Sequence, residues 1–318
     1  MSAKPRVVLT NPIHPQLLPQ LEQHCEVVLA PDTQPATLAR LVADAEGLVV
    51  RAQLPPGLFD HAPKLRAVVR HGVGLDMIPV DAATARGIPV ANLPGSNTQA
   101  VAEYCLAAML HLRRRLAAMD RVLRSEGWAA ARPFADSGTE LRGSTCGIVG
   151  VGAVGRRLAD IASALGMQVL GLTRRAESLP AHVKAADKRA LFTQSDVVVL
   201  CCPLNEETRG LVDAASVAMM KKDAILINVS RGPVIEVGAV LAALHEGRLG
   251  GAALDVHDKQ PLAGKEALFN APNLLLTPHV AGITGTSMRA MSEGAVATLL
   301  ALLRGERPRN VVNPQVFR

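Results

Sequence analysis

Two polar side chains stand directly after apolar runs that have the composition of β-strands. Arg231 follows the run that ends Asn228-Val-Ser, and His279 follows Leu274-Leu-Leu-Thr-Pro. If both runs belong to one open α/β sheet, these residues lie beyond the carboxyl ends of the strands, where such sheets bind ligands. Arginine keeps its charge and can hold an anion, whereas histidine gains or loses one proton near neutrality. The pair predicts a site that binds an acid and moves a proton.

A glycine-rich turn indicates a dinucleotide site in the same part of the chain. Gly150, Gly152 and Gly155 form the pattern G-x-G-x-x-G, with an apolar strand before it and a helical pattern after it. The first glycine allows a tight turn, the second lets a pyrophosphate approach the backbone, and the third lets helix and strand pack closely. The helix N-terminus then offers N–H groups and partial positive charge to the phosphates. The motif predicts NAD or NADP as cofactor.

The residues after the next strand indicate which of the two cofactors is preferred. An NAD site usually has Asp or Glu here to bind the adenine ribose, but the sequence has Thr173 followed by Arg174 and Arg175. A carboxylate would repel a 2′-phosphate, whereas arginine can bind it through two hydrogen bonds. We therefore expect NADP(H) to be preferred over NAD(H).

Short apolar runs alternate with helical patterns along the chain, which predicts parallel sheets with helices on both faces. The expected strands are Arg6–Thr10, Glu26–Ala30, Gly47–Arg51, Arg66–Arg70, Ile88–Ala91, Cys146–Val149, Gln168–Leu172, Val197–Cys201, Ala224–Val229, Gly251–Val256 and Leu274–Leu276. Long helices are expected over Thr98–Arg115 and Thr286–Arg304, and a polar loop over Ser125–Gly143. The fold class is α/β, with two Rossmann-like, doubly wound parallel-sheet domains.

Composition excludes several classes of protein. Of the 318 residues 49% are hydrophobic, so disorder is excluded, and only 2% are aromatic, which argues against modules that stack on bases. The net charge of +6 comes from scattered arginines, so we expect no nucleic-acid partner. The five cysteines (25, 105, 146, 201 and 202) have no metal-ligand spacing, so we expect no metal and a reducing, cytoplasmic location. No uncharged apolar run reaches about 18 residues, so no membrane span is expected.

Several further motifs carry a family resemblance. They are His71-Gly-Val-Gly74-Leu-Asp76, Gly87-Ile-Pro-Val-Ala-Asn92-Leu-Pro94, Asn97-Thr-Gln-Ala-Val101-Ala-Glu103, and Pro203-Leu204 with Glu207-Thr208-Arg209-Gly210. With the segments around Arg231 and His279, they make the chain similar to the D-isomer-specific 2-hydroxyacid dehydrogenases, which include D-3-phosphoglycerate dehydrogenases and glyoxylate/hydroxypyruvate reductases. The resemblance implies a dinucleotide-binding domain (99–285) inserted into a flavodoxin-like substrate domain (1–98 and 286–318), with catalysis in the cleft between them.

The resemblance also implies the reaction and the roles of residues. Hydride would pass between the nicotinamide and C2 of a small D-2-hydroxy or 2-oxo acid, such as hydroxypyruvate, glyoxylate or a 3-phosphoglycerate-like acid. Arg231 would hold the carboxylate and the C2 oxygen, His279 would be the acid or base, and the helix from Thr98 would form a homodimer. Cofactor contacts are expected at Gly150, Gly152, Ala153, Val154, Thr173, Arg174, Arg175, Cys202, Pro203, Thr208, Val229, Asp255 and Val101. Substrate contacts are expected at Arg51, Val73, Gly74 and Asn97.

One position departs from the family pattern. The carboxylate that pairs with the histidine is normally a Glu five residues after the aspartate of the Leu-Asp-Val strand, but counting from Asp255 gives Gln260. An amide can orient an imidazole but adds no charge to stabilise its protonated form. Gln260 therefore works as an orienting catalytic residue, or Asp258 substitutes for the acid, or the reaction differs, as in formate or phosphite oxidation. A dinucleotide-binding sensor or corepressor without turnover is a further alternative.

Overall fold

The computed structural model describes residues 4–264 and 266–317 and divides the chain into two compact units. One unit consists of the residues up to Asn97 together with those from Ile283 onward, and the other is Thr98–Gly282. Each unit is built on one parallel β-sheet, which confirms the expected fold class. We refer to them as the first unit and the second unit.

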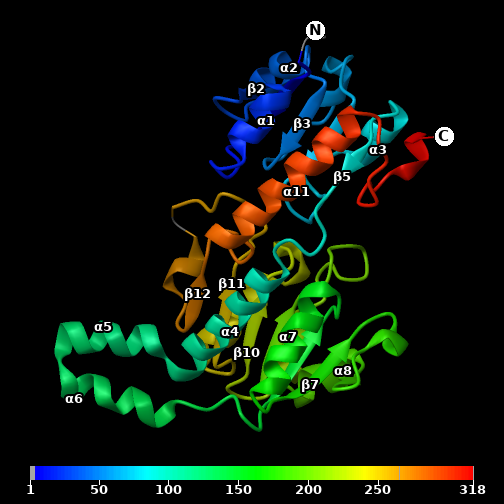
Figure 1. Cartoon of the computed structure of the whole chain (residues 1–318). Helices are drawn as coiled ribbons and strands as arrows, with labels where there is room; N and C mark the ends of the chain where they lie inside the picture. The colour runs from blue at the N-terminus through cyan, green and yellow to red at the C-terminus, as the bar shows by residue number, and fades with distance from the viewer. Residues whose placement is uncertain (1–3, 265, 318) are drawn as a thin grey trace. The chain divides into compact units, whose positions relative to one another are not determined.

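The first unit has a five-stranded sheet in the order β2-β1-β3-β4-β5. Helices α1 and α11 pack against one face through Leu21 and Leu299, and helices α2 and α3 against the other through Leu38 and Ala83 (Figure 1). Because both faces are covered, the strands are almost wholly aliphatic. The bounds are β1 Arg6–Leu9, α1 Leu18–His24, β2 Glu26–Leu29, α2 Pro35–Val42, β3 Gly47–Val50, β4 Ala67–Arg70, α3 Val80–Ala85, β5 Val90–Ala91 and α11 Gly285–Leu303.

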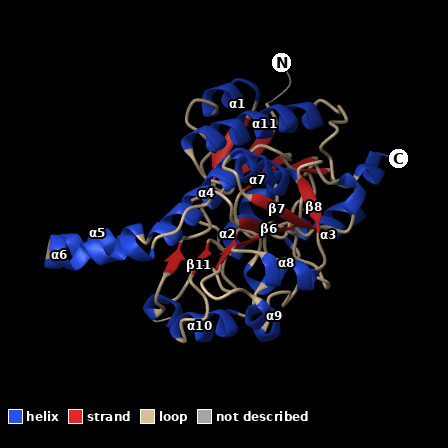
Figure 2. Ribbon diagram, turned by 90° about the horizontal axis from the view of Figure 1, so that it is seen from below, coloured by secondary structure: helices blue, strands red, loops and turns tan. Residues whose placement is uncertain are grey.

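The second unit has a seven-stranded sheet in the order β12-β11-β10-β9-β6-β7-β8. Helices α4 and α7 cover one face, and α8, α9 and α10 cover the other (Figure 2). The order reverses direction at β6, so the carboxyl ends of β6 and β9 flank the switch point where open sheets bind ligands. The bounds are α4 Thr98–Arg114, β6 Thr145–Val149, α7 Ala153–Ala164, β7 Gln168–Leu172, β8 Val183–Ala185, α8 Lys188–Gln194, β9 Val197–Leu200, α9 Ala214–Met219, β10 Ile225–Asn228, α10 Val237–His245, β11 Gly251–Leu254 and β12 Leu274–Leu276.

The prediction of a loop over residues 125–143 was wrong, because most of this segment is helical. Helix α5 (Leu116–Glu126) and helix α6 (Trp128–Ala131) form a hairpin that extends from the second unit (Figures 1 and 2). Arg115 and Gly127, both with positive φ, separate these helices from each other and from α4. The alanines of both helices favour this conformation, and a 3-10 helix follows over Arg132–Ser137. Strand β8 was also missed, because a run of three residues carries no readable alternation.

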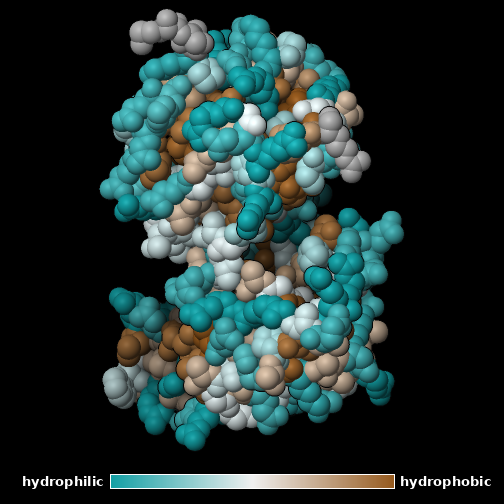
Figure 3. All heavy atoms as spheres, turned by 45° about the vertical axis from the view of Figure 1, so that its right-hand side comes forward, coloured by the Kyte–Doolittle hydropathy of each residue, from teal (hydrophilic) through white to brown (hydrophobic). Residues whose placement is uncertain are grey.

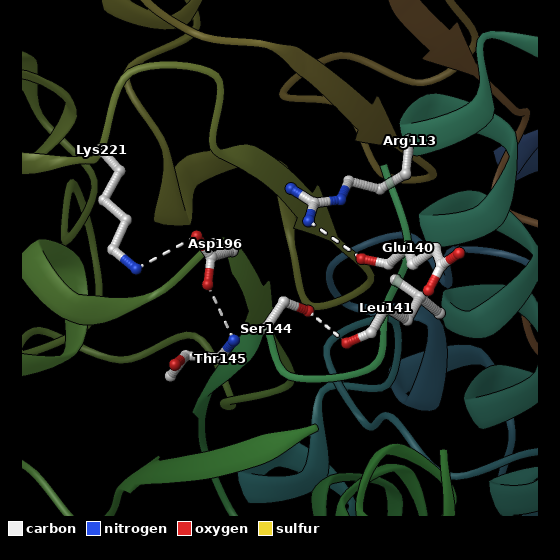
Figure 4. A network of polar contacts seen from close by, with 7 residues as sticks. All are labelled: Arg113, Glu140, Leu141, Ser144, Thr145, Asp196 and Lys221. Carbon is white, nitrogen blue, oxygen red and sulfur yellow. Dashed lines mark hydrogen bonds and ion pairs between the residues drawn. The ribbon is translucent and has the colours of Figure 1, made fainter. Parts of the chain in front are cut away.

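The segment that leads from the hairpin into the sheet is held by a small polar network (Figure 4). The Asp196 carboxylate accepts a hydrogen bond from the Thr145 amide at 2.8 Å and forms an ion pair with Lys221 Nζ at 3.1 Å. The Ser144 hydroxyl donates to the Leu141 carbonyl at 2.6 Å, and Arg113 donates to the Glu140 carbonyl at 3.2 Å. These contacts satisfy the backbone where β6 begins, next to β9.

Hydrophilic side chains cover most of the face drawn in Figure 3, as expected for charged residues that avoid the core. None of the described helices combines the length and the apolar composition needed to cross a lipid bilayer. The described cysteines are all free thiols, and four of them are buried.

Candidate active site

The glycine-rich turn after β6 has the geometry that the sequence motif demands. Gly150 has φ +90° and its backbone lies against Cys202, so a side chain would collide there. A Cβ on Gly155 would collide with the Gly150 carbonyl, which shows how closely α7 approaches the strand. Around Gly152, by contrast, a Cβ would meet no atom within 4 Å. The turn is therefore tightly packed at its two ends and open in the middle, as a backbone that receives a pyrophosphate must be.

Helix α7 begins immediately after this open position. Ala153 and Val154 form its first turn, Gly152 is the N-cap, and the first turn contains no acidic residue and no side-chain cap. The N-terminal N–H groups and the helix dipole together favour an anion. Gly150, Gly152, Ala153 and Val154 thus lie together at the carboxyl end of β6 and fit the phosphates of a dinucleotide.

The residues expected to determine the preference for NAD or NADP lie at the carboxyl end of β7. Thr173 is half-buried, whereas Arg174 and Arg175 are exposed. In the described part of the chain neither guanidinium has a hydrogen-bond or ion-pair partner. Two cations that the protein does not neutralise therefore stand next to the place where a Rossmann fold binds the adenine ribose.

The remaining expected cofactor contacts follow strands of the same sheet or lie in α4. Cys202 and Pro203 follow β9, where the Pro203 carbonyl accepts a hydrogen bond from the Thr208 hydroxyl at 2.7 Å. Val229 follows β10. Val101 is buried in α4, within the core cluster of that face of the sheet.

Arg231 lies just beyond β10, where the backbone comes close to the segment after β11. A side chain on Gly232 would collide with the backbone of His257 and Asp258, so the two loops are in contact. The Asn228 side-chain amide donates to the Arg231 carbonyl at 3.0 Å and shapes the turn. The Arg231 guanidinium donates to the Ser230 carbonyl at 2.7 Å and is half-buried. This places a permanent cation at the carboxyl edge of the sheet.

Gln260 and His279 are in direct contact. His279 Nδ1 lies 3.0 Å from Gln260 Oε1, and Gln260 Nε2 donates to the His257 carbonyl at 3.2 Å. Both side chains are exposed in the second unit. Asp258 makes no hydrogen bond with His279 among the residues that the structure describes. Of these two residues, Gln260 is therefore the one that contacts the ring.

The backbone around His279 is held by Asp255, a buried residue. Its oxygens accept hydrogen bonds from the Val280 amide at 2.8 Å and the Ala281 amide at 2.9 Å, and its carbonyl accepts from the His279 amide at 2.8 Å. His279 itself has φ +59°, which is unusual for a residue with a Cβ. These three hydrogen bonds offset the cost of that conformation. Asp255 thus supports the loop, in addition to the cofactor role expected for it.

Sequence reasoning missed two residues of this network, Tyr104 and Thr277. The Tyr104 hydroxyl lies 2.7 Å from Thr277 Oγ1, which in turn donates to Asp255 at 2.7 Å. Burial raises the pKa of Tyr104 to about 12, so its hydroxyl keeps its proton. Tyr104 is the only tyrosine of the chain, and in hindsight that was the one available signal.

A cavity of about 420 Å³ lies beside Gln260 in the second unit. Its walls are mostly apolar, with Leu262, Phe269 and Leu276 among the lining residues. His257 also lines it, and the ring of that histidine is hydrogen-bonded to the Thr277 carbonyl at 3.0 Å. His257 therefore helps to hold the backbone at Thr277.

The substrate contacts expected in the first unit lie at the carboxyl ends of β3 and β4, and before α4. Arg51 follows β3 and donates hydrogen bonds to the Pro12 carbonyl and to Met288 Sδ, and no carboxylate pairs with it in the described structure. Val73 and Gly74 follow β4, and Asn97 precedes α4.

The carbonyls of the loop after β4 are bound by side chains. Arg70 donates to the carbonyls of His71 at 2.6 Å and Gly74 at 3.1 Å, and Asn92 donates to that of Val73 at 2.7 Å. Because the loop's carbonyls are held in this way, the loop has a defined shape. His71 is buried and bonds Ser292 Oγ through Nε2 at 2.8 Å, so it packs inside the first unit.

No cluster of metal-ligating side chains occurs among residues 4–264 and 266–317.

Known proteins resemble this chain in sequence and in structure. The family model "D-isomer specific 2-hydroxyacid dehydrogenase, NAD binding domain" matches residues 106–281. The glyoxylate reductase of Aeropyrum pernix is 35% identical, over 99% of this chain and 98% of that protein. A crystal structure of the TT0316 protein from Thermus thermophilus superposes with a TM-score of 0.90 at 35% identity, covering 96% of this chain and 99% of that one.

A further structural relative was solved with ligands. It is the NADPH-dependent glyoxylate/hydroxypyruvate reductase of Sinorhizobium meliloti, in complex with NADP and malonate. It is 30% identical with a TM-score of 0.87, and the match covers 99% of each chain.

Proposed function

The chain belongs to the D-isomer-specific 2-hydroxyacid dehydrogenase family, and we propose that it reduces a small 2-oxo acid such as glyoxylate or hydroxypyruvate with NADPH. Membership makes it an NAD(P)-dependent oxidoreductase with hydroxyacid dehydrogenase activity. The substrate proposal follows the names of the relatives, which are glyoxylate and glyoxylate/hydroxypyruvate reductases. The observation that carries the cofactor proposal is the exposed pair Arg174 and Arg175, which has no acidic partner in the described structure.

The dinucleotide fits the turn after β6 because Gly152 leaves open space where the backbone must meet a pyrophosphate. The first turn of α7 would hold the pyrophosphate, and Arg174 and Arg175 would hold the 2′-phosphate. When bound, the nicotinamide supplies the hydride for C2 of the substrate.

The protein's own residues bind the acid and move a proton. Arg231 holds the carboxylate and the C2 oxygen through its guanidinium, which keeps its charge at every working pH. His279 gives a proton to that oxygen as the alcohol forms, and it takes the proton back in the reverse direction. Gln260 keeps the ring oriented through Nδ1, and Asp255 holds its backbone.

We further propose that the second unit binds the cofactor and that the first unit contributes substrate contacts. In the first unit these are the N–H groups of Val73 and Gly74, with Arg51 and Asn97. The carbonyls of this loop already have partners, which supports such a use of its N–H groups. We also propose a homodimer through the segment that begins with α4, and a reducing cytoplasmic location, which the free thiols support.

Steady-state kinetics of the full chain test the proposal. NADPH and NADH are each supplied with glyoxylate, hydroxypyruvate and 3-phosphohydroxypyruvate, and kcat/KM is compared. We expect the highest value with NADPH and one of the first two acids. A clear preference for NADH would refute the cofactor proposal. Oxidation of formate or phosphite without turnover of any 2-oxo acid would favour the alternative that Gln260 raises, and binding of NADPH without any turnover would favour a sensor.

A further inference from the structure

The proton of His279 can be located from the hydrogen bonds of Gln260. The His257 carbonyl can only accept a hydrogen bond, so the Gln260 group that faces it at 3.2 Å must be the NH₂. The amide oxygen therefore faces His279 Nδ1 at 3.0 Å. Because that oxygen can only accept, Nδ1 must carry a proton. In the neutral ring the lone pair then belongs to Nε2.

This arrangement suits a reacting group that brings its own proton. A carbonyl oxygen needs a donor, which His279 provides at Nε2 only when the ring is doubly protonated, and the amide of Gln260 adds no charge to stabilise that form. The nitrogen of a protonated imine is different, since it already carries N–H and needs an acceptor. The neutral ring, with its lone pair at Nε2, is that acceptor.

We propose that this enzyme also reduces the imines that 2-oxo acids form with ammonia or small primary amines. The inference rests on the proposed function, because it keeps the NADPH site and Arg231 as the anchor of the carboxylate. It extends the substrate class from 2-oxo acids to 2-imino acids, with amino acids as products from ammonia and N-alkyl amino acids as products from primary amines.

The reaction balances without a proton from the protein. Hydride from NADPH forms a C–H bond at C2, and the π-electrons of the C=N bond become the lone pair on nitrogen. The protonated imine becomes a neutral amine, and NADPH becomes NADP⁺. The imine carbon is two electrons more oxidised than the carbon of the amine product, and the hydride from NADPH supplies these two electrons. His279 accepts a hydrogen bond from the substrate N–H and orients it toward Nε2.

Glyoxylate and methylamine provide a direct test with the full chain. NADPH oxidation is followed between pH 7 and 9.5, with and without methylamine, and products are identified by mass spectrometry as glycolate or N-methylglycine. We expect methylamine to accelerate NADPH oxidation in the alkaline range and N-methylglycine to accumulate. Reactions without enzyme provide the background.

A variant tests whether Gln260 is the cause. Gln260→Glu places a carboxylate on His279, which favours the doubly protonated ring, so we expect the ratio of kcat/KM for the imine to that for glyoxylate to fall about tenfold. Gln194→Glu is the matched control, because Gln194 is exposed at the end of α8. This substitution adds the same charge away from the site. An unchanged ratio in Gln260→Glu would overturn the assigned role of the amide.

The outcomes separate this inference from the proposed function. Glycolate formed at the same rate with and without methylamine, and no N-methylglycine, overturns the imine proposal and leaves 2-oxo acid reduction standing. N-methylglycine without glycolate supports the imine proposal and refutes reduction of the 2-oxo acid. Bound NADPH with neither product refutes both.

Discussion

The contact between Gln260 and His279 allows the effect of Gln260→Glu on the pH dependence of kcat/KM to be predicted quantitatively. The substitution changes an amide to a carboxylate of nearly the same shape, at a position that contacts the ring at 3.0 Å. A negative charge there stabilises the imidazolium, so His279 holds its proton to higher pH. Reduction of a 2-oxo acid uses that proton, and the alkaline limb of kcat/KM should therefore move upward.

The size of the shift follows from distance and exposure. Two unit charges about 3 Å apart interact by about 1.4 kcal/mol in a medium with the dielectric constant of water. Since both side chains are exposed, this solvent-screened value is the appropriate one. It corresponds to a displacement of about one pH unit. Salt reduces the displacement because exposed charges are screened.

The assay is kcat/KM for glyoxylate with NADPH across the pH range, at fixed ionic strength. Gln260→Ala, which removes the acceptor without adding charge, should not move the limb upward, and Gln194→Glu should leave the profile in place. An alkaline limb of Gln260→Glu that coincides with that of the wild type would refute the pairing of Gln260 with His279.

Three other perturbations follow from the structure. Replacing Arg174 and Arg175 by serine should lower kcat/KM with NADPH about tenfold to a hundredfold and change that with NADH less than about twofold; equal losses with both cofactors would contradict a 2′-phosphate site. Tyr104→Phe removes the 2.7 Å hydrogen bond to Thr277, so the free energy of unfolding should fall by about 1 kcal/mol in urea denaturation, and unchanged stability would show that this bond contributes nothing. Burial lowers the pKa of His71 from 6.5 to about 4, so the unfolded chain binds a proton that the folded chain does not. The free energy of unfolding should fall by up to about 3 kcal/mol as the pH drops through this window, and His71→Gln should remove this one-proton dependence, a result that parallel pH profiles of the two proteins would contradict.

Local patterns were sufficient where the structure is made of repeating units. Aliphatic runs separated by helical patterns predicted the strands of both sheets except β8. The glycine spacing predicted the turn at Gly150, Gly152 and Gly155, because each glycine is required locally, either by a lack of space for a side chain, by the approach of a ligand to the backbone, or by a positive φ. The segment 125–143 was mistaken for a loop, although it holds the end of α5, helix α6 and a 3-10 helix, because its polar residues and glycines give no clear helical pattern.

The sequence by itself determined the fold class, the family and the residue types available for chemistry, since these depend on periodicity and on motifs within short segments. Only the tertiary structure decided how Gln260, His279, Asp255, Thr277 and Tyr104 meet. They come from a helix and from two loops at neighbouring strand ends, and no pattern along the chain specifies contacts across that separation. The direction of the hydrogen bond from His279 to Gln260, on which the chemistry depends, follows from a third group, the His257 carbonyl. A hydrogen-bond network fixes its protons only when all of its partners are placed in space.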